Sequence, residues 1–464
     1  MTVYDNGEGL AERAAARLIA LGYTQVSLLE GGVDGWHRAG GELFIDVNVP
    51  SKAFGELVES ERHTPSLAAE EVQALLDSQA DVVVLDARRF DEYQTMSIPT
   101  GISVPGAELV LRARELAPDP ATRIIVNCAG RTRSIIGTQS LINSGIANPV
   151  SALRNGTIGW TLAGQKLAHG QARRFAPTRE EHRQIAARDA RRVADKARVG
   201  RATLADLQRW QQEPKRTTYL FDVRTPEEFE AGHLPGARST PGGQLVQETD
   251  HVASVRGARL VLADDDGVRA NMSASWLAQL GWEVYVLDDL QAANFSEQGA
   301  WVAPVPAPLQ AELISPHTLA EWLPHGDTAV LDFTPSVNYV KRHIPGAFWA
   351  LRAQLANALA KVPPAERYVL TCGTSQLARL AVAEVEAITG KPVFLLQGGT
   401  LNWIAEKLPL EEGETHLASP RIDRYRRPYE GTDSPKEAMQ AYLDWEFGLV
   451  DQLARDGTHG FYVI

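Results

Sequence analysis

The segment IIVNCAGRTRSIIG, residues 124–137, contains the pattern that decides the fold. An apolar run ends at Cys128, the six-residue loop CAGRTR follows, and Ser134 is predicted to open a helix. An apolar run, a polar loop and a helix in this order are typical of a parallel sheet covered by helices. The loop holds one of only two cysteines in the chain, close to Arg131 and Arg133.

The same strand–loop–helix–strand pattern occurs four times, and each copy ends in a turn rich in Gly or Trp. The copies cover residues 2–36, 124–160, 260–290 and 368–403. Related upstream halves precede the last three copies, at 82–107, 219–239 and 329–349. The first copy has no upstream half, because the chain begins inside it. Either its start is misassigned, or this segment packs on another domain as a remnant.

The repeats predict an α/β protein built of tandem modules, each with a parallel sheet. The predicted boundaries are a partial module at 1–49, full modules at 65–170, 201–303 and 312–411, an Arg-rich helical linker at 171–200, and a tail at 412–464. The Pro-rich APVPAP, residues 303–308, reads as a linker. In the tail, residues 434–455 are predicted to form a helix with Pro435 at its first position.

Composition excludes several classes of protein. The 464 residues are 44% hydrophobic and 22% charged, with a formal net charge of −12, which argues against general binding to nucleic acid or anionic membranes. No apolar stretch approaches the ~20 residues of a membrane span, and the N-terminal residues lack the pattern of a signal peptide. Two cysteines without an export signal predict free thiols in a reducing cytoplasm.

Several short motifs together resemble the rhodanese family of sulfurtransferases. They are the Asp-x-Arg openers LDAR and FDVR, the segments GHLPGA and RHIPGA, the Cys-headed loop, and the closers LEGGVDGW and LQGGTLNW. The resemblance covers nearly the whole chain, as three full modules and one partial module. It implies tandem rhodanese-like domains, each a small central parallel sheet flanked by helices. The second module departs from the pattern, since MSIPTG stands where GHIPGA is usual and a histidine is missing.

The four loop heads are Asp5, Cys128, Asp264 and Cys372. Both cysteines of the chain therefore fall where this family carries its nucleophile. The alternative reading of each cysteine is a small buried hydrophobic residue, which fits Cys128 poorly because a buried thiol needs no arginines beside it. The aspartates cannot form a persulfide, so their modules are predicted to be inactive.

The CAGRTR loop suits a thiolate. A free cysteine has a pKa of ~8.5 and must be deprotonated to act as a nucleophile. Backbone N–H groups wrapped around one atom form an anion nest, and the following helix adds its positive end. Gly130 lets the backbone curl inward. The candidate substrate-binding residues are Ala129, Gly130, Arg131, Thr132, Arg133, Ser134 and, at the Asp-x-Arg position, Arg88; Asp86 beside it is expected to be structural.

The resemblance implies a double displacement with Cys128 as nucleophile and persulfide carrier. A small anionic sulfur donor such as thiosulfate transfers its outer sulfur, and a thiol acceptor (glutathione, thioredoxin or a protein thiol) or cyanide removes it. No metal and no cofactor are expected. Cys372 is a second candidate or a sulfur-relay partner, because its loop CGTSQL has no basic residue. His233 and His343 are expected to be structural.

Two rival functions are weighed against this one. A phosphatase of related fold needs an arginine six positions after the cysteine, where Ser134 and Ala378 stand here. Arg133 comes one step early, so the loop encloses a sulfur-sized species better than a phosphoryl group. The other rival is a non-catalytic scaffold or sulfur-relay and sensor protein, favoured by the two aspartate loop heads and opposed by the intact CAGRTR loop.

Overall fold

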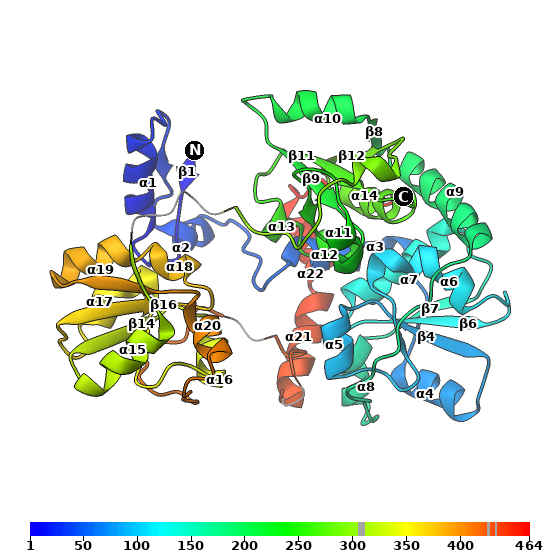
Figure 1. The fold of residues 1–464 in the computed structure, drawn as a ribbon. Coiled ribbons are helices and arrows are strands. Elements are labelled where there is room, and N and C mark those ends of the chain that lie inside the picture. The colour runs from blue at the N-terminus through cyan, green and yellow to red at the C-terminus, as the bar shows by residue number, and fades with distance from the viewer. Residues whose placement is uncertain (305–310, 425–426, 432–433) are drawn as a thin grey trace. The chain divides into compact units, whose positions relative to one another are not determined.

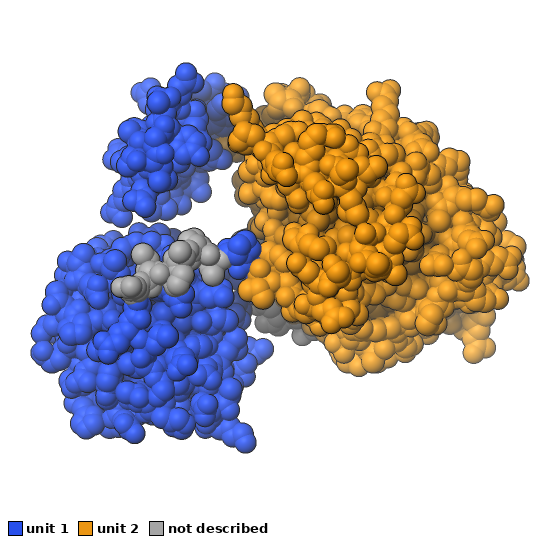
Figure 2. Space-filling model, turned by 45° about the horizontal axis from the view of Figure 1, so that its top comes forward, with its two compact units in different colours: residues 1–40, 303–426 blue, residues 41–302, 427–464 orange. Residues whose placement is uncertain are grey.

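The computed structural model describes residues 1–304, 311–424, 427–431 and 434–464. These residues form two compact units (Figure 2). Unit 1 comprises residues 1–40 and 303–426, and unit 2 comprises residues 41–302 and 427–464. Most of the APVPAP segment, residues 305–308, lies outside the described residues, so its role as a linker stays a prediction.

Three five-stranded sheets repeat one topology, and all of their strand pairs are parallel (Figure 1). Numbered in chain order within each module, the strands lie side by side in the order first, fifth, fourth, second and third. The sheet orders are β3-β7-β6-β4-β5, β8-β12-β11-β9-β10 and β13-β17-β16-β14-β15. The predicted fold class, tandem α/β modules with central parallel sheets, is confirmed.

The module that contains Cys128 has a helix before its sheet and another after it. Its elements are α3 Val49–Arg62, β3 Ser66–Leu67, α4 Ala69–Asp77, β4 Val82–Asp86, α5 Phe90–Thr95, β5 Ile102–Ser103, α6 Leu109–Leu116, β6 Arg123–Asn127, α7 Thr132–Ser144, β7 Val150–Leu153, α8 Gly156–Leu162 and α9 Glu180–Lys196. Helix α3 lies in the stretch between the first two predicted modules, and α9 lies in the Arg-rich segment.

The rest of unit 2 holds the module with Asp264 and the C-terminal helices. Its elements are β8 Gly200–Ala202, α10 Leu204–Gln211, β9 Thr218–Asp222, α11 Pro226–Ala231, β10 Arg238–Ser239, α12 Gly242–Gln247, α13 Thr249–Val252, β11 Arg259–Ala263, α14 Arg269–Gln279, β12 Glu283–Leu287, α21 Lys436–Phe447 and α22 Leu449–Asp456. The predicted tail helix is thus two helices that meet at Gly448, and Pro435 is the residue before α21.

Unit 1 holds the partial module and the module with Cys372. The partial module is β1 Thr2–Val3, α1 Ala11–Ala20, β2 Ser27–Leu28 and α2 Gly32–Arg38. The other elements are β13 Glu312–Ile314, α15 Pro316–Trp322, β14 Thr328–Asp332, α16 Ser336–Lys341, β15 Phe348–Trp349, α17 Leu355–Leu359, β16 Arg367–Thr371, α18 Gln376–Arg379, α19 Val382–Thr389, β17 Val393–Leu396 and α20 Gly399–Ala405.

The central strand β6 shows why these segments form buried parallel sheets. Successive strand side chains point to opposite faces, and here Ile124 and Val126 join one hydrophobic cluster while Ile125 joins another. All three are fully buried. Because helices cover both faces of the sheet, the strand is a continuous apolar run rather than an alternation of apolar and polar residues.

The two modules of unit 2 share one hydrophobic core. Phe54 of α3, Ile135 of α7 and Trp276 of α14 belong to the same buried cluster. The indole N–H of Trp276 also donates a 2.8 Å hydrogen bond to Ser140 Oγ of α7. Helix α9 buries an alanine-rich stripe in these cores. The Arg-rich segment is thus solvated on one face only and joins the two modules by packing.

Each sheet has an aspartate at the end of its second strand, and the partner of that aspartate differs between modules. Both carboxylate oxygens of Asp86 and of Asp222 accept hydrogen bonds from the guanidinium of the arginine two residues later. Asp332 is followed by Thr334 instead and accepts its backbone N–H at 2.8 Å. Asp332 is fully buried and forms no ion pair with any described residue, so burial raises its pKa to about 6.

The exchange Asp332→Asn is expected to stabilise the protein at neutral pH. A carboxyl group whose folded pKa lies above its ordinary value of 3.8 destabilises the folded state. The loss of stability grows as pH rises above 3.8 and becomes constant above about 6. At about 1.4 kcal/mol per pKa unit, the gain at pH 7 is on the order of 2–3 kcal/mol. Thermal unfolding of both proteins between pH 4.5 and 7.5 measures it.

The matched control is Asp222→Asn, which removes the partner of buried Arg224 and should destabilise at every pH tested. A difference between Asp332→Asn and the wild type that stays constant over the pH range would contradict the assignment.

No helix within the described ranges is long and apolar enough to cross a membrane.

Candidate active site at the Cys128 loop

Cys128 stands at the carboxyl end of β6, the central strand of its sheet. The neighbouring strand β4 ends at Asp86, which lies opposite Asn127 in register. Asp86 accepts hydrogen bonds from the Asn127 amide at 2.8 Å and from Arg88. This buried cluster fixes the two strand ends from which the loop starts. The loop then enters α7 at Thr132, two residues before the predicted start at Ser134.

Loop carbonyl groups are bound to the beginning of α8. The N–H of Thr157 donates to the carbonyl of Cys128 at 2.9 Å, and the N–H of Ile158 donates to that of Ala129 at 3.0 Å. A Cβ at Gly156 would lie 2.3 Å from the Cys128 carbonyl oxygen, so only glycine fits this approach. The Cys372 and Asp5 loop heads are held in the same way by N–H groups of Thr400 and Val33.

The aspartate loop heads show what such a loop binds. Asp264 accepts the N–H groups of Gly267 at 3.1 Å and Ala270 at 2.8 Å. Asp5 accepts the N–H of Ala11 at 2.8 Å, together with two other N–H groups of its loop. In both modules the carboxyl group at the loop head thus accepts hydrogen bonds from backbone N–H groups of its loop. These bonds lower the pKa of Asp5, whereas burial raises the pKa of Asp264 well above its ordinary value. The sixth residue after Cys128, equivalent to Ala270 and Ala11, is Ser134.

Arg133 forms a bidentate ion pair with Glu92 of α5. Its two terminal nitrogens donate to the carboxylate at 2.7 and 2.8 Å. This pair holds the pKa of Glu92 at about 2, with Arg133 overcoming the effect of burial. The third module repeats the pair, since Arg269 donates to Glu228. Burial raises the pKa of the neighbouring Cys128, and the charge of Arg133 opposes that rise.

Arg131 is paired with acidic residues of α3. Its Nε and Nη2 donate to the two oxygens of Glu56 at 2.8 Å each, and Nη2 also donates to Glu59. Nη1 donates to Asn155 at 3.1 Å, and the guanidinium lies over the ring of Phe447 of α21. Arg131 thus links the loop to three other segments, and its positive charge is compensated.

The Cys128 thiol is 2% exposed, and its environment opposes ionisation at rest. Burial raises the pKa of the thiol, while Arg133 and Ser134 act against that rise. The thiol donates to the Ser134 hydroxyl at 3.5 Å, and that hydroxyl donates to the carbonyl of Arg131 at 2.7 Å. The expectation that the loop lowers the thiol pKa is therefore wrong for this covered state, because both arginines are paired with carboxylates and water is excluded.

The C-terminal helix α21 covers the loop. Ala129 lies in one hydrophobic cluster with Tyr429, Tyr442 and other residues of α8 and α21. A Cβ at Gly130 would lie 3.2 Å from Glu446 Oε2 and 3.3 Å from Tyr442 Cε1. Gly130 therefore serves a second purpose besides curvature, since a larger residue would meet the α21 side chains.

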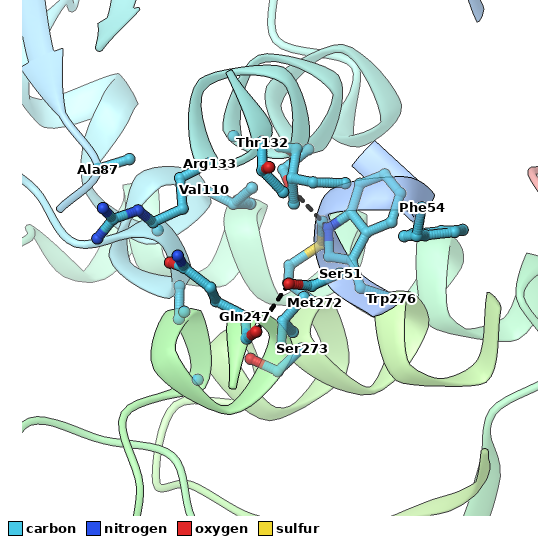
Figure 3. Close-up of a pocket in the computed structure, with 18 residues that line it drawn as sticks. Ser51, Phe54, Ala87, Val110, Thr132, Arg133, Gln247, Met272, Ser273 and Trp276 are labelled. Atoms are coloured by element: carbon cyan, nitrogen blue, oxygen red, sulfur yellow. Dashed lines mark hydrogen bonds between the residues drawn. The ribbon is translucent and has the colours of Figure 1, made fainter. Parts of the chain in front are cut away.

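A small cavity of about 40 Å³ lies behind the loop, between α3, α7, α12 and α14. Figure 3 shows Arg133 toward one end of it and Phe54 with Trp276 toward the other. Its volume suits one or two water molecules rather than a substrate. Cys128 is not among its lining residues.

The Cys372 loop differs in its surroundings. Ser375 takes the position equivalent to Arg131, with a left-handed backbone, and its hydroxyl donates to the Leu396 carbonyl at 2.6 Å. Cys372 is buried, while Thr374 beside it is exposed. Among the described residues, no atom lies within 4 Å of a Cβ placed on Gly373. The loop thus lacks both the arginine pairs and the cover of the Cys128 loop.

The structure brings Cys128 and the predicted residues 129–134 together at one loop. Arg88 lies below it, fully buried against Asp86 and the Met96 carbonyl, so Asp86 is structural as expected. Substrate binding by Arg88, Arg131 or the other loop residues stays a prediction. His233 and His343 are buried, and each donates its Nδ1–H to a backbone carbonyl.

Sequence reasoning missed the acidic residues around the loop, namely Glu56, Glu59, Glu92 and Glu446. Glu92 could have been found from the repeat, because Glu228 stands at the same offset from Asp222. The other three come from segments outside the repeated pattern. Within the described ranges, no group of three or more His, Cys, Asp or Glu residues could hold a metal ion.

The exchange Glu92→Gln is expected to make Cys128 more reactive. It leaves the charge of Arg133 uncompensated beside the thiol, which lowers the thiol pKa and speeds alkylation roughly three- to tenfold at pH 7. Loss of the ion pair should also destabilise the protein by up to about 3 kcal/mol. Iodoacetamide labelling followed by mass spectrometry, in a Cys372→Ser background, measures the rate.

Glu228→Gln removes the equivalent carboxylate of the third module and provides the control. It should leave the alkylation rate of Cys128 unchanged. Equal rates in the wild type and the Glu92→Gln variant would show that the charge of Arg133 does not govern the thiol.

Comparisons with known proteins agree with this architecture. The Rhodanese-like domain family matches three segments, residues 68–163, 203–289 and 315–406. The crystal structure of a thiosulfate sulfurtransferase from Pseudomonas aeruginosa is 74% identical, with a TM-score of 0.97, and the match covers 100% of this chain and 88% of that one. The uncharacterized protein YqhL of Bacillus subtilis (strain 168) is 37% identical over 73 residues, which are 16% of this chain and 56% of that protein.

The three matched segments coincide with the three five-stranded sheets, and together they account for more than half of the chain. The cysteine or aspartate loop heads of these modules all follow the central strand of their sheet. The chain therefore belongs to the rhodanese family and contains three rhodanese-like modules.

Proposed function

We propose that this protein is a thiosulfate sulfurtransferase-like enzyme that carries sulfane sulfur as a persulfide on Cys128. The observation that supports this most is the loop itself: Cys128 occupies the position at which two other modules bind a carboxylate with backbone N–H groups. A sulfur anion at Cys128 would be stabilised by the equivalent N–H groups of its own loop. The similarity to the Pseudomonas aeruginosa thiosulfate sulfurtransferase supports the same reaction.

The reaction proceeds in two displacements. The Cys128 thiolate attacks the outer sulfur of thiosulfate, an S–S bond forms to Sγ, and the S–S bond of thiosulfate breaks with its electron pair leaving on sulfite. A thiolate acceptor then attacks the outer persulfide sulfur, and the electron pair of the broken bond returns to Sγ. Residues 129–134 supply the N–H groups that bind the anionic sulfur donor and the persulfide.

The donor is a small anionic sulfane-sulfur compound, with thiosulfate the first choice, and the acceptor is a thiol such as glutathione, thioredoxin or a protein thiol, or cyanide. Free Cys128 and Cys372 suit a reducing compartment, which supports a cytoplasmic location. Arg133 is the better candidate for the donor's anionic end, because it already acts electrostatically on the thiol.

Cys372 is the second candidate for sulfur transfer or a relay position. Its loop head is held like that of Cys128, with the Cys372 carbonyl bound to the N–H of Thr400. The absence of a basic residue in the loop disfavours a dianionic donor there. The alternative for the whole chain, a non-catalytic scaffold or sensor, is favoured only by the modules headed by Asp5 and Asp264.

Intact-protein mass after mixing with thiosulfate tests the proposal. One added sulfur raises the mass by ~32 Da through a persulfide on a thiolate nucleophile. The wild type and Cys372→Ser should form the adduct, and Cys128→Ser should not. Loss of the adduct only in Cys372→Ser would move the site to the fourth module. Absence of any adduct in the wild type would favour the scaffold.

A further inference from the structure

Glu446 of α21 is a buried carboxyl group at the Cys128 loop with one oxygen unused. Its side chain is 1% exposed. Oε1 accepts a 2.9 Å hydrogen bond from the Tyr442 hydroxyl. Oε2 has no hydrogen-bond partner among the described residues, although it lies 3.2 Å from the Cβ position of Gly130. A buried polar atom without a partner is costly, so this oxygen calls for an explanation.

Charged and titratable groups surround Glu446 on several elements. From α3 it faces Glu56 and Lys52, from the loop Arg131 and Cys128, and from its own side Tyr442 and Tyr429. Helix α8 carries no charged residue, and on α22 the charged residues are Asp451, Arg455 and Asp456. The cations nearby are paired elsewhere: Lys52 binds Asp46 at 3.0 Å, and Arg131 binds Glu56.

This environment keeps Glu446 protonated at neutral pH. Burial is the main cause, and Glu56 adds to it, so the pKa of Glu446 rises to about 8. Oε1 already accepts a hydrogen bond from the Tyr442 hydroxyl. The proton of the carboxyl group therefore lies on Oε2, the oxygen next to Gly130. The carboxyl group therefore offers a hydrogen-bond donor to the loop, without an acceptor among the described residues. An anionic substrate would supply that acceptor.

We propose that Glu446 is the acid–base residue of sulfur transfer at the Cys128 loop, donating a proton to the departing anion of the sulfur donor and later taking one from the thiol acceptor. The inference rests on the proposed function and adds a residue for which no comparison or motif assigns a role. This role explains why a carboxyl group of α21 lies against Gly130, where an apolar side chain would pack equally well.

The protons and electrons balance over the cycle. The Cys128 thiol first loses its proton to solvent. In the first displacement the resulting thiolate takes the outer sulfur, the electron pair leaves on sulfite, and the Glu446 proton passes to sulfite to give hydrogensulfite. In the second, the Glu446 carboxylate accepts the proton of the acceptor thiol. The resulting acceptor thiolate bonds to the outer persulfide sulfur, and the electron pair of the breaking bond returns to Sγ. The released Cys128 thiolate takes up a proton from solvent, so the enzyme regains its thiol and its protonated Glu446.

Single-turnover sulfite release from thiosulfate tests this assignment in the full-length protein. The wild-type rate should rise with pH as the Cys128 thiolate forms, and should level off above about 8, where Glu446 loses its proton. Glu446→Gln should lower the rate at pH 7 by ~100-fold, and its rate should keep rising through about pH 8. The adduct of one sulfur, ~32 Da, should still accumulate slowly in this variant. Glu437→Gln, the same exchange at an exposed position of α21, should behave as the wild type.

Tyr442→Phe gives a second readout that does not require Glu446 to be replaced. The lost hydrogen bond lowered the pKa of Glu446, so the pH at which the rate levels off should become higher in this variant. With glutathione as acceptor, Glu446→Gln should also slow removal of the sulfur.

The outcomes separate the two proposals. The role of Glu446 alone is overturned if the wild type releases sulfite and Glu446→Gln has the same rate and pH profile. If that variant does not fold, the same conclusion follows when the rate of Tyr442→Phe levels off at the same pH as that of the wild type. A wild type that releases no sulfite overturns the proposed function and this inference together.

Discussion

The site depends on the direction in which the peptide groups of one loop point. The carbonyls of Cys128 and Ala129 are bound to the first N–H groups of α8. With its carbonyl oxygens held outward, a short loop can gather its N–H groups around the residue at its head. Gly156 allows α8 to come this close. The residue at the loop head then determines what these N–H groups bind. An aspartate places its own carboxyl group there permanently, and a cysteine can place a transferable sulfur there.

The ion pairs around the loop contribute more to its conformation than to its net electrostatic field. Arg131 and Arg133 look like anion ligands in the sequence, but each is bound by carboxylates in the structure. Buried ion pairs contribute little net stability, although leaving one partner alone is costly. The pairs therefore fix α3 and α5 against the loop. The remaining electrostatic control of the thiol comes from Arg133, Ser134 and the exclusion of water.

The repeated pattern allowed most of the fold to be predicted, because strand, loop and helix are encoded within about 35 consecutive residues. The nucleophile candidates and the two aspartate heads were likewise visible from their alignment. Glu56 and Glu446 were not, since the loop against which they lie is far away in the sequence and single charged residues on amphipathic helices usually face solvent. The break of the tail helix at Gly448 and the two-residue error at the start of α7 are ordinary boundary errors.

The cover of the Cys128 loop has a consequence for biosynthesis. Helix α21 is translated roughly 300 residues after the loop, a delay on the order of tens of seconds at ordinary rates of synthesis. During that interval a nascent second module presents Cys128 without Tyr442 and Glu446 above it. The burial that raises the thiol pKa is then incomplete, so the nascent thiol ionises more readily than the mature one. Ribosome-bound chains are thus the form of this protein most open to oxidation at Cys128.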